Sequence, residues 1–318
     1  MKFMQIVSST TLAAALIFGA AAQAADYPTK QIELMVPSSA GGGTDTVARA
    51  FAEAAKKYLP KAIGVVNKPG GSGAIGLSEL AVARPDGYKI GMTIVEMSIL
   101  PSLGMVSFTT DDFRPIARLN ADPAAVTVKA DAPWNTIEEF LAYAKTNPRA
   151  IRIGNAGTGS IWHLAAGALE EKTGAQFNHV PFDGASPAVT ALLGGHIEAV
   201  TVSPGEVINH VAGGKLKTLA IMADQRVKSF ETVPTLKERK IDLSIGTWRG
   251  LVVPKNTPQN VVDVLKVAAR KIAEEPAFRD TLTRLNLGYG YLDDAAFKVV
   301  IDQDRETFKA LIAKLGLK

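Results

Sequence analysis

The sequence predicts an α/β protein with two lobes. Short apolar runs typical of strands alternate with longer amphipathic runs typical of helices, and the alternation restarts part-way along the 318 residues. This length is enough for two hydrophobic cores. We expect parallel strands with helices on both faces. The chain is expected to cross between the lobes near 125–130 and to return near 247–253, which leaves a two-segment hinge and a cleft lined by strand ends.

The first lobe is predicted from three strands and the two helices between them. The expected strands are 32–37, 63–67 and 88–96, and the expected helices are 46–59 and 70–83. In the first helix, apolar residues recur every three to four positions, namely Val47, Ala50, Phe51, Ala54 and Tyr58. Two C-terminal helices, 259–275 and 294–316, are expected to complete this lobe.

The second lobe repeats the pattern. Its expected strands are 125–130, 151–156, 177–182, 197–203 and 216–223, and its expected helices are 136–147, 161–174, 186–195 and 204–214; a returning strand and turn follow at 249–258. We therefore predict a discontinuous first lobe and a continuous second lobe. The boundaries are 25–126 and 252–318 for the first, and 127–251 for the second.

The N-terminus has the layout of a secretory signal peptide over residues 1–24. Lys2 supplies a positive charge, residues 11–22 form a short apolar run, and Ala22-Gln23-Ala24 forms a small-x-small cleavage site. The run is too short to cross a hydrocarbon core of roughly 30 Å. No cysteine follows that could carry a lipid anchor. We expect cleavage after Ala24 and export to the periplasm.

Composition excludes several functional classes. Loss of Lys2 lowers the formal net charge from +4 to +3, and basic and acidic residues are interleaved, so we expect no nucleic-acid binding. With no cysteine there is neither a disulfide nor thiol chemistry. The four histidines are not spaced as metal ligands, so no metal and no cofactor are expected. We expect a monomer.

A glycine-rich turn at 38–46 separates the first expected strand from its helix. Successive glycines expose backbone N–H groups at a helix start, where the helix dipole favours an anion. A P-loop lysine is missing, and an ordinary tight turn is the alternative. Asp45 is expected to cap the helix. The residues predicted to contact a ligand here are Ser38, Ser39, Gly41, Gly42 and Thr44.

A second turn of the same construction lies at 154–163. Its predicted ligand contacts are Gly157, Thr158, Gly159, Ser160 and His163. Ser160 could instead cap the following helix, and His163 could be structural. Two glycine-rich helix starts that face one cleft would form an electropositive clamp for a carboxylate.

Further candidates lie on neighbouring loops. Residues 181–187 and 203–205 are expected to form cleft walls, with contacts from Phe182, Asp183 and Ser203. Arg249 lies in the returning segment, where it could bind a carboxylate bidentately or form a hinge salt bridge.

The segment 71–76, GSGAIG, matches the dinucleotide-binding pattern, with Glu96 about 20 residues further on. A loop separates the preceding strand from these glycines, and the expected export opposes a nucleotide cofactor. A helix entry at the edge of the cleft is the favoured interpretation. The sequence contains neither the G-x-S-x-G pattern of serine hydrolases nor the H-E-x-x-H pattern of zinc proteases. A Ser-His-Asp triad formed by residues distant in sequence is still an open alternative.

Ordered motifs along nearly the whole chain resemble the extracytoplasmic receptors of tripartite tricarboxylate transporters, also called Bug receptors. They include YPTKQIELMVPSSAGGGTDTVAR, VVNKPGGSGAIG, RPDGYKIG, GNAGTGSIWHLA, VPFDGASPAVTALLGGHIEA, GGKLKTLAI, VPTLKE and TWRGLVVPKNTP. The resemblance implies a type II-like, Venus-flytrap periplasmic-binding-protein fold. It also implies that the loops 38–45 and 157–160 hold a carboxylate through backbone amides and bridging waters.

In function, the resemblance implies a receptor that binds a small di- or tricarboxylate or a related acid. It would deliver the acid to a membrane permease of one large and one small subunit. Several positions depart from the family pattern: Ser38, Ala40 and Gly43 stand where an aromatic residue, a proline and a varied residue are more usual, and Ala191 replaces a frequent aspartate. Phe182-Asp183-Gly184 stands where Tyr-Lys-Gly is more common, so a hydroxyl is lost and a charge is reversed beside the cleft, which bears on substrate identity. The alternative function is an exported hydrolase that acts on a carboxylate-containing substrate.

Overall fold

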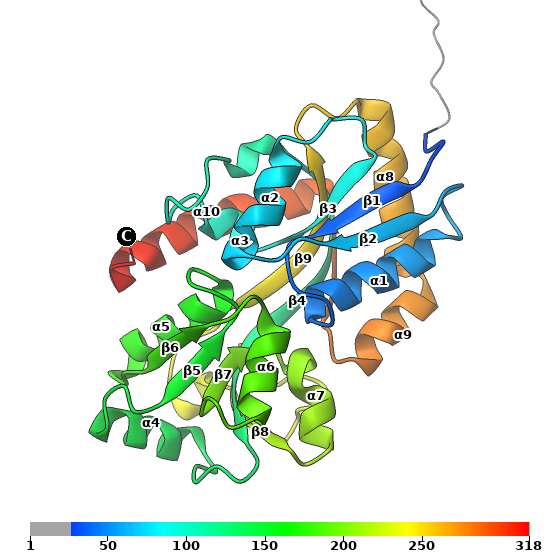
Figure 1. Cartoon of the computed structure of the whole chain (residues 1–318). Helices are drawn as coiled ribbons and strands as arrows, with labels where there is room; N and C mark the ends of the chain where they lie inside the picture. Colours follow the sequence, from blue (N-terminus) through cyan, green and yellow to red (C-terminus); the bar gives the residue numbers. More distant parts are fainter. Residues whose placement is uncertain (1–26, 318) are drawn as a thin grey trace, which may run out of the picture.

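The computed structural model describes residues 27–317 and folds them into two α/β lobes (Figure 1). Their strands form one mixed sheet in the order β2-β1-β3-β9-β4-β7-β5-β6, with β10 and β8 also paired to β4. The predicted signal peptide lies outside the described residues. Within them, no helix combines the length and the apolarity needed to cross a bilayer.

The first lobe, in the upper part of Figure 1, holds both ends of the described chain. Its first strands are parallel, with β1 between β2 and β3. Its elements are β1 (Ile32–Val36), α1 (Gly43–Ala55), β2 (Ile63–Asn67), α2 (Ala74–Ala81), β3 (Lys89–Ile94), α3 (Glu96–Ile99), α8 (Gln259–Glu274), α9 (Pro276–Arg284), β10 (Tyr289–Asp293) and α10 (Asp294–Leu315).

The second lobe, green in Figure 1, is built around parallel strands β7, β5 and β6. Its elements are α4 (Ile137–Thr146), β5 (Arg152–Asn155), α5 (Ile161–Thr173), β6 (Asn178–Pro181), α6 (Ala185–Leu193), β7 (Ala199–Val202), α7 (Pro204–Ala212) and β8 (Leu216–Met222). The two-lobed α/β class predicted from the sequence is confirmed.

Two adjacent antiparallel strands connect the lobes. β4 (Phe113–Lys129) pairs with β9 (Gly246–Pro254) as far as the pair Pro123–Gly246, and from Ala124 onward it pairs with β7 and β8. The backbones come close at Gly246, where any Cβ would clash with the carbonyl oxygen of Asp122. A glycine is therefore required for this strand pair to close.

The sheet departs from the sequence prediction in two respects. It is mixed rather than parallel, because β9 and β4 run antiparallel to their neighbours. β4 also begins at Phe113 rather than near 125. The prolines in its first half hide it from pattern analysis: Pro115 lies at a register shift, and Pro123 lies where the strand changes partners. The short α9 and β10 were likewise not predicted from the sequence.

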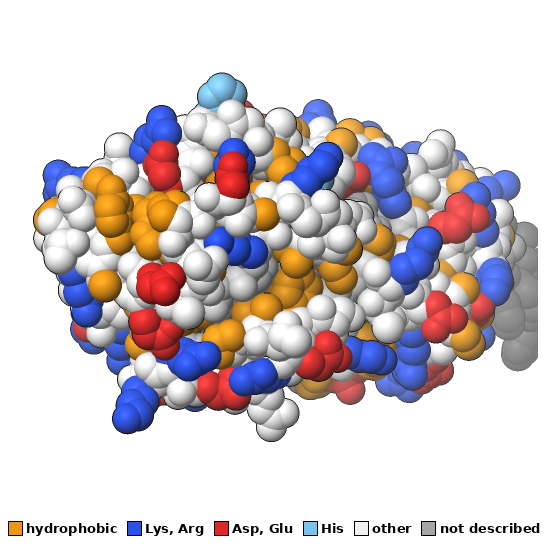
Figure 2. All heavy atoms as spheres, turned by 90° about the horizontal axis from the view of Figure 1, so that it is seen from below, with side chains coloured by type: hydrophobic (Ala, Val, Ile, Leu, Met, Phe, Trp, Pro, Cys, Tyr) orange, Lys and Arg blue, Asp and Glu red, His pale blue; other side chains and the backbone are white. Residues whose placement is uncertain are grey.

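Apolar side chains pack on both faces of the sheet. One cluster joins β1 and α1 to the buried faces of α8 and α9. The other cluster fills the second lobe and continues to α10. Outside these cores, the face shown in Figure 2 carries Lys and Arg side chains interleaved with Asp and Glu, with no extended patch of one sign.

Removal of the Phe51 side chain tests the packing that holds α1 against the sheet. Phe51 is 2% exposed, so Phe51→Ala should lower the free energy of unfolding by about 3–5 kcal/mol, through lost burial and the cavity left behind. Val267 on α8 is 56% exposed and provides the control: Val267→Ala should change the free energy of unfolding by less than about 0.5 kcal/mol. Urea unfolding followed by circular dichroism measures both, and equal losses would contradict this packing.

Candidate functional site

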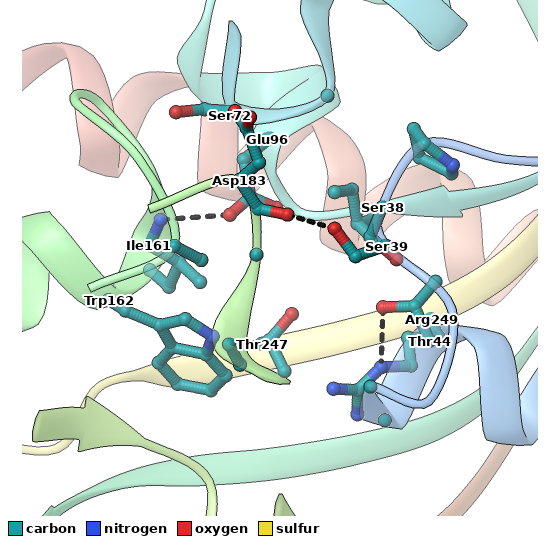
Figure 3. Close-up of a pocket in the computed structure, with 18 of the residues that line it drawn as sticks. Ser38, Ser39, Thr44, Ser72, Glu96, Ile161, Trp162, Asp183, Thr247 and Arg249 are labelled. Carbon is teal, nitrogen blue, oxygen red and sulfur yellow. Dashed lines mark hydrogen bonds between the residues drawn. The ribbon is translucent and has the colours of Figure 1, made fainter. Parts of the chain in front are cut away.

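A small cavity of about 40 Å³ lies where the two lobes meet (Figure 3). The first lobe contributes the loop after β1, the start of α2 and the end of β3, and the second lobe contributes the loops after β5 and β6 and the start of α7. The carboxyl ends of strands from both lobes thus form the site, as is usual for α/β proteins. On this scale a water-sized group takes up roughly 10–15 Å³, so the closed cavity suits a small ligand.

Hydrogen bonds to Asp45 fix the conformation of the glycine-rich loop after β1. The Asp45 carboxylate accepts hydrogen bonds from the Gly41 backbone (2.9 Å), the Asn67 amide (3.0 Å) and the Arg49 guanidinium (2.9 Å). Burial raises the pKa of Asp45, but these hydrogen bonds outweigh it and leave the pKa below its usual value. Asp45 therefore fixes the loop that precedes α1, although it makes no capping hydrogen bond to the start of the helix, because its backbone partner, Gly41, comes before the N-cap residue Gly42.

The second glycine-rich loop is fixed by the side chains at the start of α5. The Ser160 hydroxyl accepts a hydrogen bond from the His163 backbone (3.2 Å), and the His163 Nδ1 accepts one from the Gly159 backbone (3.1 Å). Burial lowers the pKa of His163 to about 4. A neutral ring is what Nδ1 needs in order to accept. Both side chains shape the loop, as the structural alternatives for Ser160 and His163 proposed.

Hydrogen bonds join the lobes directly across the cavity. The Ile161 backbone donates to Glu96 Oε1 (2.9 Å), the Ser72 hydroxyl donates to the Thr158 carbonyl (2.7 Å), and the Ser39 hydroxyl donates to the Asp183 carbonyl. Two of these bonds are drawn in Figure 3. The lobes are therefore closed on one another.

Gly157 lies at a close approach between the lobes. Its φ is +118°, and a Cβ there would come 2.5 Å from the Ser72 Oγ of the first lobe. Both the backbone conformation and the neighbouring lobe thus require glycine at this position.

Arg249 forms the centre of a buried ion network at the crossing strands. Its guanidinium donates to Thr44 (3.0 Å), Asn120 (2.7 Å) and Asp122, and lies 3.5 Å from the Glu206 carboxylate. Arg249 and Asp122 side chains are each 2% exposed. Burial raises the pKa of Glu206, although the charge of Arg249 opposes this. The geometry favours the hinge salt bridge over a free carboxylate anchor.

The sequence-predicted contacts differ in where they lie. Those that line the cavity are Ser38, Ser39, Gly42, Thr44, Asp183 and Arg249. Gly41 lines another hollow, which shares Gly42, Gly43 and Glu206 with the cavity. Those that do not line the cavity are Gly157, Thr158, Gly159, Ser160, His163, Phe182 and Ser203. More of the predicted contacts on the loop 38–46 line the cavity than of those on the loop 154–163.

Sequence reasoning did not select several lining residues, namely Ser72, Glu96, Trp162, Glu206 and Thr247. Three of them carried a visible signal. Ser72 belongs to the segment 71–76 that matches the dinucleotide-binding pattern, and Glu96 is the acidic residue about 20 positions after it. Of the glycines of this segment, Gly73 lines the cavity. Glu206 forms a capping box with Ser203, which the S-x-x-E spacing encodes. Trp162 and Thr247 carried none.

Comparison with known proteins assigns the chain to a family. Residues 47–317 match the family described as the tripartite tricarboxylate transporter family receptor. The chain belongs to this family. A curated relative from Cupriavidus necator, the UPF0065 protein in the gbd 5' region, is 33% identical over 98% of this chain and 95% of its own length.

Solved structures of family members share the fold. A TctC solute-binding protein from Polaromonas, solved without ligand, is 56% identical over 91% of this chain and 99% of its own, with a TM-score of 0.69. The periplasmic binding protein BugD is 30% identical over 92% of this chain and 99% of its own, with a TM-score of 0.86. The predicted family and its Venus-flytrap fold are confirmed.

Substitution of Arg249 separates a structural role from a ligand contact. Arg249→Met leaves two buried carboxyl groups without their cation, so the free energy of unfolding should fall by about 3–5 kcal/mol. Arg152 pairs with Glu198 at the surface, and Arg152→Met should cost less than about 1 kcal/mol. Urea unfolding without ligand measures both. An Arg249→Met protein as stable as the wild type would contradict the structural role.

The pH dependence of stability tests the burial of Glu96. Burial raises the pKa of Glu96 from 4.5 to about 7, so the folded state holds its proton more tightly than the unfolded state. The free energy of unfolding should fall by roughly 3 kcal/mol as pH rises from 4.5 to 7, at 1.36 kcal/mol per pKa unit. Glu96→Gln should remove this part of the pH dependence. Urea titrations at several pH values measure it, and parallel pH profiles would contradict the burial.

Proposed function

We propose that this protein is a periplasmic receptor that captures a small organic carboxylate and delivers it unchanged to a membrane permease. The family name implies a transporter of three parts, and the permease would supply one large and one small subunit. The observation that carries the proposal is the small cavity enclosed between two closed lobes, with the starts of α1 and α5 beside it. Export would follow from cleavage after Ala24.

Family members support an organic acid as ligand. Two proteins of Rhodopseudomonas palustris share the fold at 22% and 24% identity; one was solved with adipate, and MatC was solved with bound malate. In this chain, helix starts and glycine-rich loops supply partial positive charge and backbone N–H groups. A carboxylate can therefore bind without a free basic side chain.

Closure of the lobes would be the signal that the permease recognises. A ligand that contacts both lobes stabilises the closed state by its differential affinity for that state. The 56%-identical Polaromonas protein superposes less well than BugD at 30% identity, with TM-scores of 0.69 and 0.86. Structural agreement thus does not follow sequence identity, which is consistent with lobes that take different relative orientations within one fold.

The identity and fate of the ligand test the proposal. Mass spectrometry of native protein purified from the periplasm should find a bound organic acid, and a thermal-shift screen should show a melting temperature that rises with its concentration. The recovered acid should be chemically unchanged after prolonged incubation. Turnover of the acid would instead support the exported hydrolase.

A substitution at Gly157 tests the closed state. Gly157→Ala introduces backbone strain and a clash with Ser72 across the cleft, so affinity for the co-purified acid should fall at least tenfold. Gly174 also has a positive φ, of +73°, but no atom lies within 4 Å of its added Cβ. Gly174→Ala should therefore lower the free energy of unfolding and leave the affinity for the acid unchanged. Calorimetry measures both affinities, and an equal effect of the two substitutions would contradict closure at this contact.

A further inference from the structure

The side chains around the cavity carry an excess of acid. Glu96, Asp183 and Glu206 line it, whereas Arg249 is the single basic residue among the described residues that do so. The guanidinium of Arg249 is itself engaged with Asp122 and Glu206. No side-chain cation is therefore left to pair with a second carboxylate of a ligand.

Glu96 occupies the place where the sequence predicted a ligand carboxylate. Its Oε1 accepts the hydrogen bond from the first N–H group of α5, at Ile161. The protein thus supplies its own carboxyl group to the start of this helix, from the opposite lobe. A ligand carboxylate placed there would compete with Glu96 and lie beside its charge.

The second oxygen of Glu96 is available to a ligand. The residue is 4% exposed and lines the cavity, and within residues 27–317 its carboxyl group accepts hydrogen bonds from backbone N–H groups alone, those of Ile161 and of Glu96 itself. Figure 3 shows Glu96 near Ser72 and Asp183 at one end of the cavity, with Arg249 and Thr44 at the other. Above its pKa of about 7, Glu96 is a buried carboxylate whose oxygen at the cavity requires a hydrogen-bond donor.

A carboxylate has a separate place on the first loop. The Ser38 hydroxyl is buried at the cavity and has no hydrogen-bond partner among residues 27–317. It follows β1 directly and lies beside the glycines that precede α1. This loop can hold one carboxylate through its hydroxyl and backbone N–H groups, with no acidic side chain of its own facing the ligand.

We propose that Glu96 makes this receptor select a monocarboxylate that presents a hydrogen-bond donor, an ammonium or a hydroxyl group, to the Glu96 carboxylate. The carboxylate of the ligand binds at the loop after β1, and its donor group faces Glu96. This assignment rests on the proposed receptor function and sets the chemical class of the ligand. A dicarboxylate of equal length is disfavoured, because its second charge meets Glu96.

Matched acids that differ only at one end test the assignment. The probes are β-alanine, 3-hydroxypropionate, propionate and malonate, together with their four-carbon counterparts, measured by calorimetry at pH 8 on ligand-free protein. The amino or hydroxy acid should bind at least tenfold more tightly than the dicarboxylate of the same length. The two donor arms distinguish an ammonium ligand from a hydroxyl ligand.

The variant Glu96→Gln provides the sharper comparison. Its amide oxygen can still accept from Ile161, while its NH2 group presents a donor to the cavity. The ratio of dicarboxylate to amino-acid or hydroxy-acid affinity should therefore rise at least tenfold. Glu79, which pairs with Lys68 and Lys89 away from the cavity, provides the control Glu79→Gln, for which the ratio should stay unchanged.

Each outcome decides between the two proposals. Binding of these acids with no preference for a donor, or an unchanged ratio in a folded Glu96→Gln protein, overturns the role of Glu96 and leaves the receptor function intact. If no probe binds, the co-purified acid decides: one carboxylate plus an amino or hydroxyl group supports the assignment, and an acid that binds through two carboxylates overturns it. Absence of any organic acid ligand overturns the receptor function itself.

Discussion

The antiparallel pairing of β4 with β9 is the constraint on which the two-lobed structure depends. These strands carry the chain between the lobes side by side, and Gly246 lets their backbones close at the point where β4 changes partners. Arg249 projects from β9 next to this crossing and holds Asp122 of β4 and Glu206 of α7. One buried cation thus ties the connecting strands to the second lobe, and three carboxyl or hydroxyl partners lose stabilisation if it is removed.

The same network shapes the chemistry of the cleft. Because the charge of Arg249 is already shared with buried acids, attraction for the anion that we propose as ligand would come chiefly from backbone N–H groups at helix starts. Asp45 holds the first of these loops in place. Glu96 covers the first N–H of α5 from the opposite lobe. The cleft therefore combines one site that is open to a carboxylate with one end that is acidic.

Few direct hydrogen bonds hold the two lobes closed across the cavity. Ser72 and Ser39 bond to backbone carbonyls of the second lobe, and Gly157 allows the approach. Such hydrogen bonds each contribute roughly 0.5–1.5 kcal/mol net. A small ligand can shift an equilibrium held by contacts of this size, as the proposed receptor function requires.

The sequence by itself determined the α/β class, most element positions and the family, because these depend on local periodicity, turn chemistry and motif order. It also placed the glycine-rich loop 38–46 beside the cleft, since a strand end, three glycines and a helix start are contiguous in the chain. Only the tertiary structure decided which partners the buried charged side chains have. Glu96 accepts a hydrogen bond from the Ile161 backbone, and Arg249 pairs with Asp122 and Glu206, across long separations in sequence. No local pattern encodes such pairings, because burial and charge balance arise only when the lobes are packed together.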